Sequence, residues 1–370
     1  MAKTIRILQI MGKVGSGGVE SVIMNYYRHI NKEKVQFDFI IHKDAEKAYV
    51  NEIHSLGGVV YEVTPYSENI IKFTYEIYKI VKIGNYNIVH SNLNSLSFFP
   101  LLAAYFAGAK IRILHNHTMA NKSEGIRSLV KSTLRPLAKI FANQYWACGK
   151  DAAEWIYGKK SISRNEVTIV NNAIDLNKFA FNLNLRNKLR SELKVEDCLV
   201  IGHVGRFVET KNHRFLIEIF NKLVNIKDDS RLLLVGDGPL AKSIMNKAND
   251  LGLIDKILFL GERRDVADLY NAMDIFVLPS LYEGLPVVGV EVQANSLPSL
   301  ISDTVTKEIK YSNIVFFADI TSGIEKWVEK INDIASIKVR TCNYQSNINK
   351  FDISKQCQIL EQVYINLKNK

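Results

Sequence analysis

The sequence lacks an apolar run long enough to cross a membrane. Of its 370 residues 47% are hydrophobic, yet no uninterrupted apolar stretch approaches the roughly 18 residues that a transmembrane helix needs. Met1-Ala-Lys-Thr leads directly into a strand-like run and shows no signal-peptide pattern. We therefore expect a cytoplasmic protein.

Closely spaced cysteines are also missing. The four cysteines, at positions 148, 198, 342 and 357, have no Cys-x-x-Cys spacing, which argues against a disulfide framework and against a structural metal site. There is no Asp-x-Asp motif, no glycine-rich loop ending in Lys-Ser or Lys-Thr, and no dinucleotide-binding spacing with an acid about 20 residues downstream. These absences weigh against P-loop enzymes and NAD-linked proteins.

Positive charge is abundant but unevenly spread. The formal net charge is +10, and residues 101–150 hold eight Lys or Arg against one acid, Glu124, so this segment alone carries +7. A local basic patch favours an acidic partner: a phospholipid surface, a phosphorylated ligand or nucleic acid.

Part of this charge recurs at every fourth position of a helix expected over residues 123–142. The basic residues are Arg127, Lys131, Arg135 and Lys139. Apolar residues fill the other faces, which is typical of a helix lying on an anionic bilayer. A surface helix with a solvated basic face has the same pattern, so both interpretations stay open. Pro136 predicts a kink or an interruption.

The chain exceeds the usual size of one hydrophobic core, which predicts two domains. Strand-like and helix-like runs alternate through both halves, which predicts parallel sheets covered by helices on both faces. We place an N-terminal Rossmann-like domain at residues 1–172 and a second one at 173–353. A terminal helix, 354–370, is expected to return to the first. Ligands of such sheets bind beyond the carboxyl ends of the strands.

In the first half, several strand ends carry polar or glycine-rich residues. A turn containing Gly17 and Gly18 follows the first strand; it either lets the backbone approach a phosphate or sugar, or is a plain tight turn. His90, His115 and His117 follow or end two later strands. No other ligand type stands at a metal-like spacing, so a polar contact in a cleft is favoured over metal binding.

In the second half, the stretch from Pro279 to Ala294 predicts a strand, a loop and a helix start. The loop contains Glu283, Gly284 and Leu285, Pro286 suits the first position of a helix, and Glu291 lies further along it. A helix start of this kind favours anions.

Two cations are predicted at the same edge of the second sheet. Arg206 and Lys211 lie in the loop after the strand 199–204, where a diphosphate would be a natural partner. The strand 231–235 leads into a second glycine-rich loop, Gly236-Asp-Gly-Pro239. Taken alone, the two cations are also compatible with solvated loop charges.

Together these motifs resemble those of the retaining, nucleotide-sugar-dependent glycosyltransferases of family four. The resemblance rests on Gly205-Arg206 with Lys211-Asn212, on Gly236 to Pro239, and on the spacing of Glu283 and Glu291. It implies a GT-B fold, in which two Rossmann-like domains face each other across a cleft. Val292 and Ser296 depart from the pattern in ways that concern helix packing.

The resemblance also implies roles for individual residues. Arg206 and Lys211 would hold the donor diphosphate, Glu291 the ribose, and Glu283 would lie near the donor sugar. Gly284 and Leu285 would contribute to the donor site. Gly17 and Gly18 would approach the sugar and phosphate, and His117 or His115 would contact the sugar. The family needs no essential metal, and the nucleotide-sugar is a substrate, so no cofactor is expected.

The sequence thus predicts a hexosyl- or N-acetylhexosaminyl-transferase of surface polysaccharide synthesis. Its donor would be a UDP-sugar, and its acceptor a lipid-linked saccharide or polysaccharide at the inner face of the plasma membrane. A nucleotide-sugar epimerase of the same architecture is the alternative enzyme. A nucleic-acid-binding or NAD-linked Rossmann protein is a third interpretation, disfavoured by the missing fingerprint and by the amphipathic form of the charge.

Overall fold

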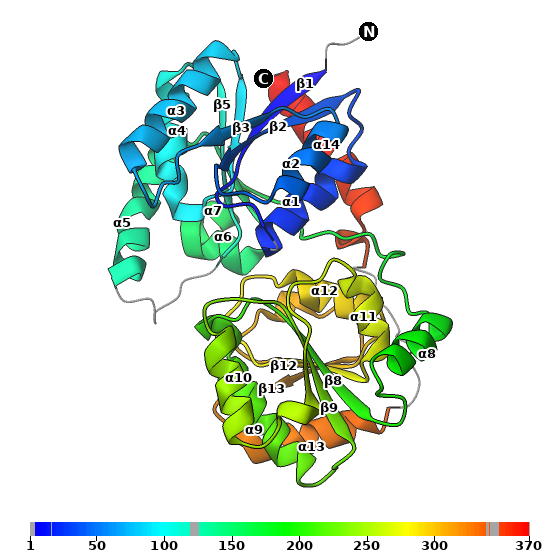
Figure 1. Cartoon of the computed structure of the whole chain (residues 1–370). Helices are drawn as coiled ribbons and strands as arrows, with labels where there is room; N and C mark the ends of the chain where they lie inside the picture. The colour runs from blue at the N-terminus through cyan, green and yellow to red at the C-terminus, as the bar shows by residue number, and fades with distance from the viewer. Residues whose placement is uncertain (1–3, 16, 119–125, 338–339, 341–347, 370) are drawn as a thin grey trace. The chain divides into compact units, whose positions relative to one another are not determined.

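The computed structural model describes residues 4–15, 17–118, 126–337, 340 and 348–369, without the side chains of 126–131. The chain divides into two units (Figure 1). Unit 1 comprises Met1–Ala173 with Asp352–Lys370, and unit 2 comprises Ile174–Phe351. Each unit is built on one parallel sheet with helices packed against it, which confirms the predicted α/β class.

Unit 1 has a seven-stranded sheet in the order β3-β2-β1-β4-β5-β6-β7. Its elements are β1 (Ile5–Ile10), α1 (Gly18–His29), β2 (Val35–His42), α2 (Lys47–Ser55), β3 (Val60–Val63), α3 (Ile70–Ile83), β4 (Ile88–Ser91), the 3-10 turn η1 (Asn94–Ser97), α4 (Phe98–Phe106), β5 (Ile111–Asn116), α5 (Ile126–Phe141), β6 (Gln144–Ala147), α6 (Lys150–Tyr157), α7 (Lys159–Ser163), β7 (Val167–Ile169) and α14 (Ile353–Lys368).

Unit 2 has a six-stranded sheet in the order β10-β9-β8-β11-β12-β13. Its elements are α8 (Leu183–Glu192), β8 (Leu199–Val204), η3 (Glu209–Lys211), α9 (His213–Val224), β9 (Ser230–Val235), α10 (Ala241–Asp250), η4 (Ile254–Lys256), β10 (Ile257–Phe259), α11 (Val266–Ala272), β11 (Ile275–Leu278), α12 (Val287–Ala294), β12 (Ser299–Ser302), η5 (Lys307–Ile309), β13 (Val315–Ala318), α13 (Ile324–Ala335) and η6 (Ile348–Lys350).

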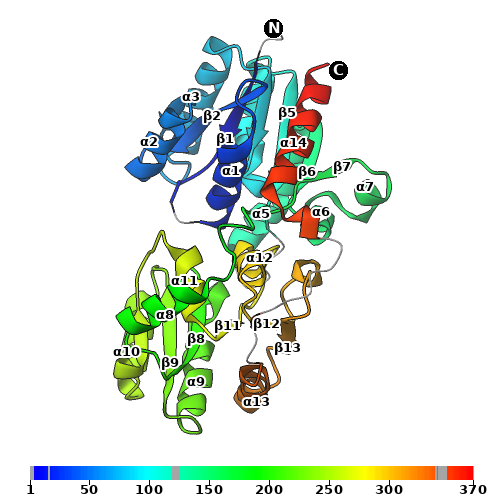
Figure 2. The same ribbon diagram turned by 90° about the vertical axis from the view of Figure 1, so that its right-hand side faces the viewer.

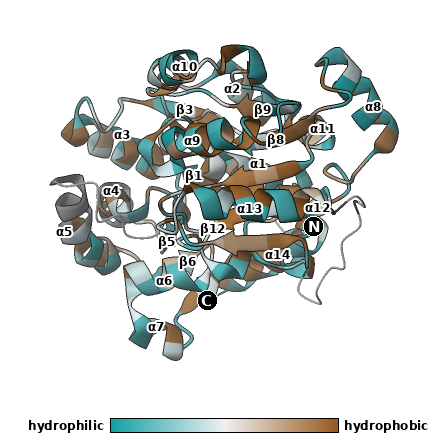
Figure 3. Ribbon diagram, turned by 90° about the horizontal axis from the view of Figure 1, so that it is seen from below, coloured by the Kyte–Doolittle hydropathy of each residue, from teal (hydrophilic) through white to brown (hydrophobic). Residues whose placement is uncertain are grey.

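The central strands are buried along their whole length. Every residue of β2, β8, β11 and β12 is buried, as expected for parallel strands covered on both faces. Figure 3 shows β8 and β12 as predominantly hydrophobic, whereas the helices carry both hydrophilic and hydrophobic residues. The cores therefore lie between the strands and the inner faces of the helices.

The order of the strands reverses once in each sheet. β1 is flanked by β2 and β4, and β8 is flanked by β9 and β11. Loops that leave the carboxyl ends of such neighbours diverge to opposite faces and open a crevice for ligands. Arg206 and Lys211 follow β8, and Glu283 follows β11, so the predicted cations and carboxylate flank the reversal in unit 2.

The terminal helix α14 packs on α1 and β1 of unit 1 (Figure 2). The carboxylate of Glu361 accepts a hydrogen bond from the backbone amide of Asn31 at 2.8 Å. Tyr364 is fully buried among the strands of that unit. The return of this helix to the first half of the chain was predicted because a polar break precedes it.

Three local predictions differ from the structure. The strand β13 was missed, although its apolar run from Ile314 to Ala318 is as long as those of strands that were predicted. Helix α5 is not interrupted at Pro136, since it packs along α4 and tertiary contacts hold the helix together. Pro286 is the N-cap of α12 with φ −67° and ψ 124°, one position before the helix.

Asp274, directly before β11, joins this strand to the helix α8. It accepts hydrogen bonds from the backbone amide of Val200 at 2.8 Å and from Arg190 Nη1 at 3.0 Å, and it pairs with Arg186. Burial alone would raise the pKa of Asp274, but the amide and the two guanidinium groups together lower it below its usual value. The ionised carboxylate therefore stabilises the strand that leads to the predicted site.

We expect Asp274→Asn to lower the free energy of unfolding at pH 7 by about 2 to 4 kcal/mol, because it leaves buried guanidinium groups without their counter-charge. The folded pKa is depressed, so this stabilisation is present above the unfolded pKa and is lost as the pH falls through the folded one. Urea unfolding at pH 7 and pH 3 checks this. Asp228→Asn, at an exposed ion pair with Lys256, is the control; an equal effect of both variants would contradict the prediction.

Candidate functional site

The loops after β8 and β11 contact each other at the carboxyl edge of unit 2. The backbone amide of Leu281 donates to the carbonyl of Thr210 at 2.8 Å. This places Arg206 and Lys211 on one side of the reversal and the segment from Glu283 to Leu285 on the other. Arg206 is exposed on its loop, whereas Leu285 is buried.

Lys211 and Glu283 form an ion pair at this edge. Lys211 Nζ lies 2.5 Å from Glu283 Oε1, with side-chain exposures of only 16% and 19%. Ser280 Oγ donates to the same carboxylate oxygen at 3.0 Å, and Thr304 Oγ1 donates to the carbonyl of Ser280 at 2.8 Å. Both groups are thus held in place, one of each charge, with little water around them.

Two glycines bring the loops after β8 and β9 into backbone contact. Gly236 has φ +128°, and a Cβ atom there would overlap the carbonyl oxygen of Gly205. The backbone amide of Phe207 donates to the carbonyl of Asp237 at 2.9 Å. Gly205 in turn lies against the side chain of Lys211, with its virtual Cβ 3.3 Å from Lys211 Cδ. The glycine-rich loop therefore supports the position of the lysine.

Glu291 lies on α12, where its Oε2 accepts a hydrogen bond from the hydroxyl of Tyr270 at 2.7 Å. Burial raises the pKa of Glu291 to about 7, although the hydrogen bond from Tyr270 and the charge of Lys178 oppose this shift. The side chain is partly exposed. Near pH 7 the group is therefore partly protonated, and its ionised form can accept hydrogen bonds from the hydroxyl groups of a ligand.

The start of α12 lies between the two carboxylates. Gly284 and Leu285 lead into the N-cap Pro286, and the amides at the positive end of this eight-residue helix are those of its first residues, Val287 and Val288. A cationic pair of side chains, an amide-rich turn and two carboxylates are thus arranged along one edge. This arrangement fits a ligand that has both anionic groups and hydroxyl groups.

In unit 1, Gly17 is the N-cap of α1 and Gly18 is its first residue. The carboxylate of Glu20, in the first helical turn, occupies the space that a Cβ atom of Gly17 would need. In this turn a side chain therefore lies close against the backbone of Gly17. The glycine pattern did not reveal Glu20 as the polar residue there.

The predicted histidines belong to a buried polar network in unit 1. His90 Nε2 lies 3.0 Å from His115 Nδ1, and the rings of His115 and His117 are 4.0 Å apart. The hydroxyl of Tyr364 lies 2.7 Å from His90 Nδ1. His115 is enclosed within β5, whereas His117 directly follows this strand.

Hydrogen bonds from neighbouring amides determine which ring nitrogens carry protons. Gln9 Nε2 donates to the Tyr364 hydroxyl at 3.2 Å, so this hydroxyl donates to His90 Nδ1, and His90 Nε2–H then donates to His115. Asn92 Nδ2 donates to Gln9 Oε1 at 3.0 Å, which leaves Asn92 Oδ1 to accept from His117 Nε2–H at 3.1 Å. His117 Nδ1 is consequently an unprotonated acceptor.

All three imidazoles are neutral near pH 7. Burial lowers the pKa of His117 to about 3, and it lowers the pKa values of His90 and His115 well below the ordinary value, with neighbouring imidazoles adding to the effect. His115 Nε2 has no hydrogen-bond partner among the described residues. His117 can therefore accept a hydrogen bond but is not a cation.

Two members of the predicted basic stripe on α5 contact the end of α6. Arg135 Nη1 donates to the carbonyl of Trp155 at 2.7 Å, and Lys139 Nζ donates to that of Tyr157 at 3.2 Å. Carbonyls at the end of a helix lack backbone partners and carry partial negative charge, which explains both contacts. The side chains of Arg127 and Lys131 lie outside the described residues.

Sequence reasoning missed the residues that hold the predicted ones. In unit 2 the carboxylate of Glu291 is held by Tyr270, and in unit 1 the histidine network is held by Gln9 and Tyr364. No local sequence pattern marks these residues. Ser280 lay inside the stretch from Pro279 to Ala294, where its spacing of three from Glu283 was a signal that could have been used. Within the described part of the chain, no three His, Cys, Asp or Glu side chains are grouped to hold a metal ion.

Both halves of the chain match models of known protein families. Residues 16–178 match the model described as Glycosyltransferase Family 4, and residues 198–336 match that of Glycosyl transferases group 1. The putative glycosyltransferase EpsF of Bacillus subtilis (strain 168) is 36% identical over 335 residues, which cover 88% of this chain and 86% of that protein.

A second relative has a more specific name. It is the UDP-Gal:alpha-D-GlcNAc-diphosphoundecaprenol alpha-1,3-galactosyltransferase of Escherichia coli, 27% identical over 309 residues, which cover 80% of each chain. Among solved structures, Anabaena Alr3699/HepE in complex with UDP-glucose aligns with a TM-score of 0.80 and 19% identity, over 98% of this chain and 100% of that one. This likeness concerns the fold.

We expect Tyr364→Phe to change the protonation pattern of the buried histidines, because His90 Nδ1 loses its donor at 2.7 Å and keeps only the more distant amide of Gln9 at 3.4 Å. Long-range ¹H–¹⁵N spectra of the imidazoles would show altered shifts for His90 and His115. Unit 1 should also lose about 1 to 3 kcal/mol of stability, the cost of an unsatisfied buried group. Tyr75→Phe, at a tyrosine that is 55% exposed, is the control. Unchanged nitrogen shifts in Tyr364→Phe would disprove the hydrogen-bond order.

Proposed function

Since the chain belongs to glycosyltransferase family 4, we propose that it transfers a sugar from a UDP-sugar to a lipid-linked or polysaccharide acceptor, with retention of the anomeric configuration. We place this reaction at the cytosolic face of the membrane. The names of the relatives support the donor and the acceptor, because one of them uses UDP-Gal and a diphosphoundecaprenol-linked acceptor. Family membership also favours a transferase over the epimerase alternative.

The observation that carries the proposal is the Lys211–Glu283 pair at the strand reversal of unit 2. A diphosphate needs cations, and it would find the largely buried Lys211 and the exposed Arg206 beside the start of α12. As the bond between sugar and phosphate breaks, negative charge develops on the leaving diphosphate. Lys211 and Arg206 stabilise this charge, and their contribution to the rate is electrostatic.

Glu283 and Glu291 have different tasks in this proposal. Lys211 and Ser280 both bond to Oε1 of Glu283 and hold this carboxylate in place, and we assign to it the hydroxyl groups of the donor sugar. Glu291, oriented by Tyr270, accepts hydrogen bonds from the ribose hydroxyls. A charge-assisted hydrogen bond of this kind contributes about 1.5 to 3 kcal/mol.

In unit 1 we assign to His117 a hydrogen bond from a sugar hydroxyl, since the network leaves Nδ1 as an acceptor. His115 orients His117 from behind. Gly17 and Gly18 let the backbone approach the sugar and phosphate. Retention is explained by attack on the face from which the diphosphate leaves, with a phosphate oxygen taking the acceptor proton. None of these steps requires a metal ion.

We expect Lys211→Ala to reduce kcat about 100- to 1000-fold, the usual cost of removing one group that stabilises developing charge. The measurement is transfer of labelled sugar from UDP-sugars to membrane lipid, with release of UDP followed in parallel. Lys222→Ala, on the exposed side of α9, is the matched control. Undiminished turnover in Lys211→Ala would refute the assignment, and UDP release that is independent of acceptor would point to another reaction.

Nucleotide binding should strengthen between pH 6 and pH 8, because the pKa of Glu291 lies near 7 and only the ionised form makes charge-assisted bonds. Below its pKa the affinity should fall about tenfold per pH unit, since one unit corresponds to about 1.4 kcal/mol. Calorimetric titration of UDP checks this. Glu291→Gln should bind weakly and show a flat profile; a variant that keeps the slope would assign the titration to another group.

A further inference from the structure

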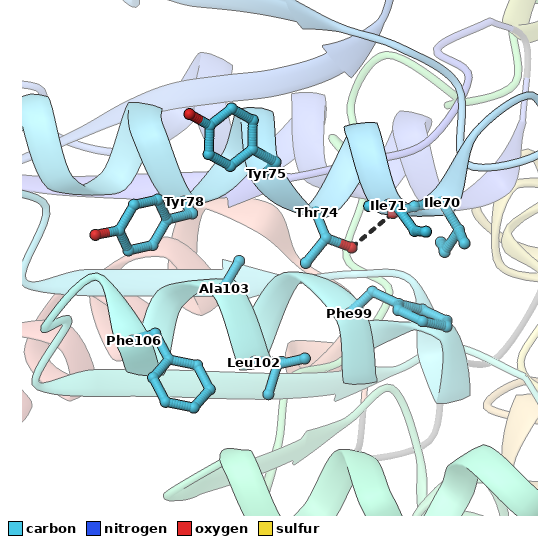
Figure 4. Close-up of a pocket in the computed structure, with 9 residues that line it drawn as sticks. All are labelled: Ile70, Ile71, Thr74, Tyr75, Tyr78, Phe99, Leu102, Ala103 and Phe106. Carbon is cyan, nitrogen blue, oxygen red and sulfur yellow. Dashed lines mark hydrogen bonds between the residues drawn. The ribbon is translucent and has the colours of Figure 1, made fainter.

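The helices α3 and α4 lie side by side in unit 1 and leave an apolar groove between them (Figure 4). The groove encloses about 420 Å³. Its lining is almost entirely hydrophobic and comes from these two helices: Ile70, Ile71, Thr74, Tyr75 and Tyr78 from α3, and Phe99, Leu102, Ala103 and Phe106 from α4. The polar side-chain atoms of these nine residues are the hydroxyl groups of Thr74, Tyr75 and Tyr78. The hydroxyl of Thr74 donates a hydrogen bond to the carbonyl of Ile70.

Large apolar side chains around the groove are exposed. Ile71 is 79% exposed, Phe106 67% and Tyr75 55%. Burying a side chain of this size stabilises a protein by roughly 1.5 to 3 kcal/mol relative to leaving it exposed. A contiguous patch of such exposed side chains is typical of an interaction surface. The patch is therefore a candidate interaction surface.

The charges around the groove are positive. Lys72, Lys79 and Lys82 are exposed on α3, and α4 contains no charged residue. Glu76, the single acid of the two helices, instead turns its carboxylate to the backbone amide of Thr64, at 2.7 Å. The partner thus meets lysines without a competing acid on either helix.

Aromatic rings lie directly beneath these lysines. Lys79 Nζ lies 4.5 Å from the centroid of the Tyr75 ring, and Lys82 Nζ lies 5.3 Å from that of Tyr78 and 2.8 Å from its hydroxyl. Tyrosine has an apolar body and a polar tip, and lysine has an apolar stem and a charged end. Side chains of both kinds suit a boundary between hydrocarbon and charged head groups.

We propose that the surface formed by α3 and α4 docks on an anionic phospholipid bilayer. Acyl chains enter the groove, and Lys72, Lys79 and Lys82 contact the lipid phosphates. A second copy of the chain fits this surface poorly, because facing copies would bring their lysines together. The proposal rests on the proposed function in one respect: the lipid-linked acceptor would be in the same bilayer.

The position of the groove suits such docking. Ile70 and Phe99 are near the starts of their helices, which lie at the carboxyl edge of the sheet, and Asn94 in the turn before α4 accepts a hydrogen bond from the backbone amide of His117 at 2.7 Å. Docking through the groove would bring this edge, with the histidine assigned to the sugar, close to the head groups.

The test is co-sedimentation with vesicles of phosphatidylglycerol and phosphatidylethanolamine that contain no polyprenyl lipid. We expect Ile71→Ser with Phe106→Ser to abolish binding. The triple change of Lys72, Lys79 and Lys82 to Gln should weaken binding about fivefold for each lysine, as expected for cations near an anionic surface. All these side chains are exposed, so the fold is retained. The controls are Ile226→Ser, at a residue 62% exposed in unit 2, and Lys222→Gln.

Three results would overturn the proposal. The first is full vesicle binding by the groove variants. The second is binding that occurs only when a polyprenyl phosphate is added, which would make the groove a site for the acceptor's tail. The third is a change in the sedimenting mass of the variants in the absence of vesicles, which would indicate self-association. UDP titration of the same variants separates this test from that of the proposed function. If the docking proposal is right, the groove variants lose vesicle binding but bind UDP normally. If the proposed function is wrong, the unchanged protein fails to bind UDP although it still binds vesicles.

Discussion

The ion pair between Lys211 and Glu283 is the contact around which the candidate site of unit 2 is organised. It joins two loops that leave the sheet on opposite sides of the strand reversal, and the glycines at 205 and 236 let the backbones behind it come close enough. Without a ligand, each charge satisfies the other. A diphosphate that binds the lysine therefore redistributes an existing bond, which keeps both side chains ordered beforehand and reduces the entropy lost on binding.

The histidines of unit 1 illustrate the opposite electrostatic situation. Burial lowers the pKa values of His90, His115 and His117 and keeps the three rings neutral. Hydrogen bonds determine which ring nitrogens donate and which accept. A neutral imidazole with a fixed tautomer is a directional acceptor that does not repel a cationic group nearby. The two units thus contribute different chemistry: ionic contacts in unit 2 and neutral, oriented ones in unit 1.

Much of this architecture could be predicted from sequence because parallel strands bring their carboxyl ends to one edge. Arg206, Lys211, Glu283 and Glu291 were found because each follows a recognisable strand or helix start. The prediction overlooked β13, whose apolar run was a usable signal, and it failed at Pro136, where tertiary packing outweighed a local preference. Partners such as Tyr270 and Tyr364 had no local signal, since 21 and 355 residues separate them from Glu291 and Gln9. The groove between α3 and α4 was also missed, because it forms only when two helices meet.

The donation of Tyr364 by α14 affects the order in which the chain can become structured during synthesis. Unit 2 lies entirely between the two segments of unit 1, and domains generally fold as they emerge from the ribosome. Unit 2 has all its strands before α14 is made, whereas the imidazoles of unit 1 lack their hydroxyl donor until then. Unit 1 begins to be translated first, and its buried hydrogen-bond network is therefore completed last.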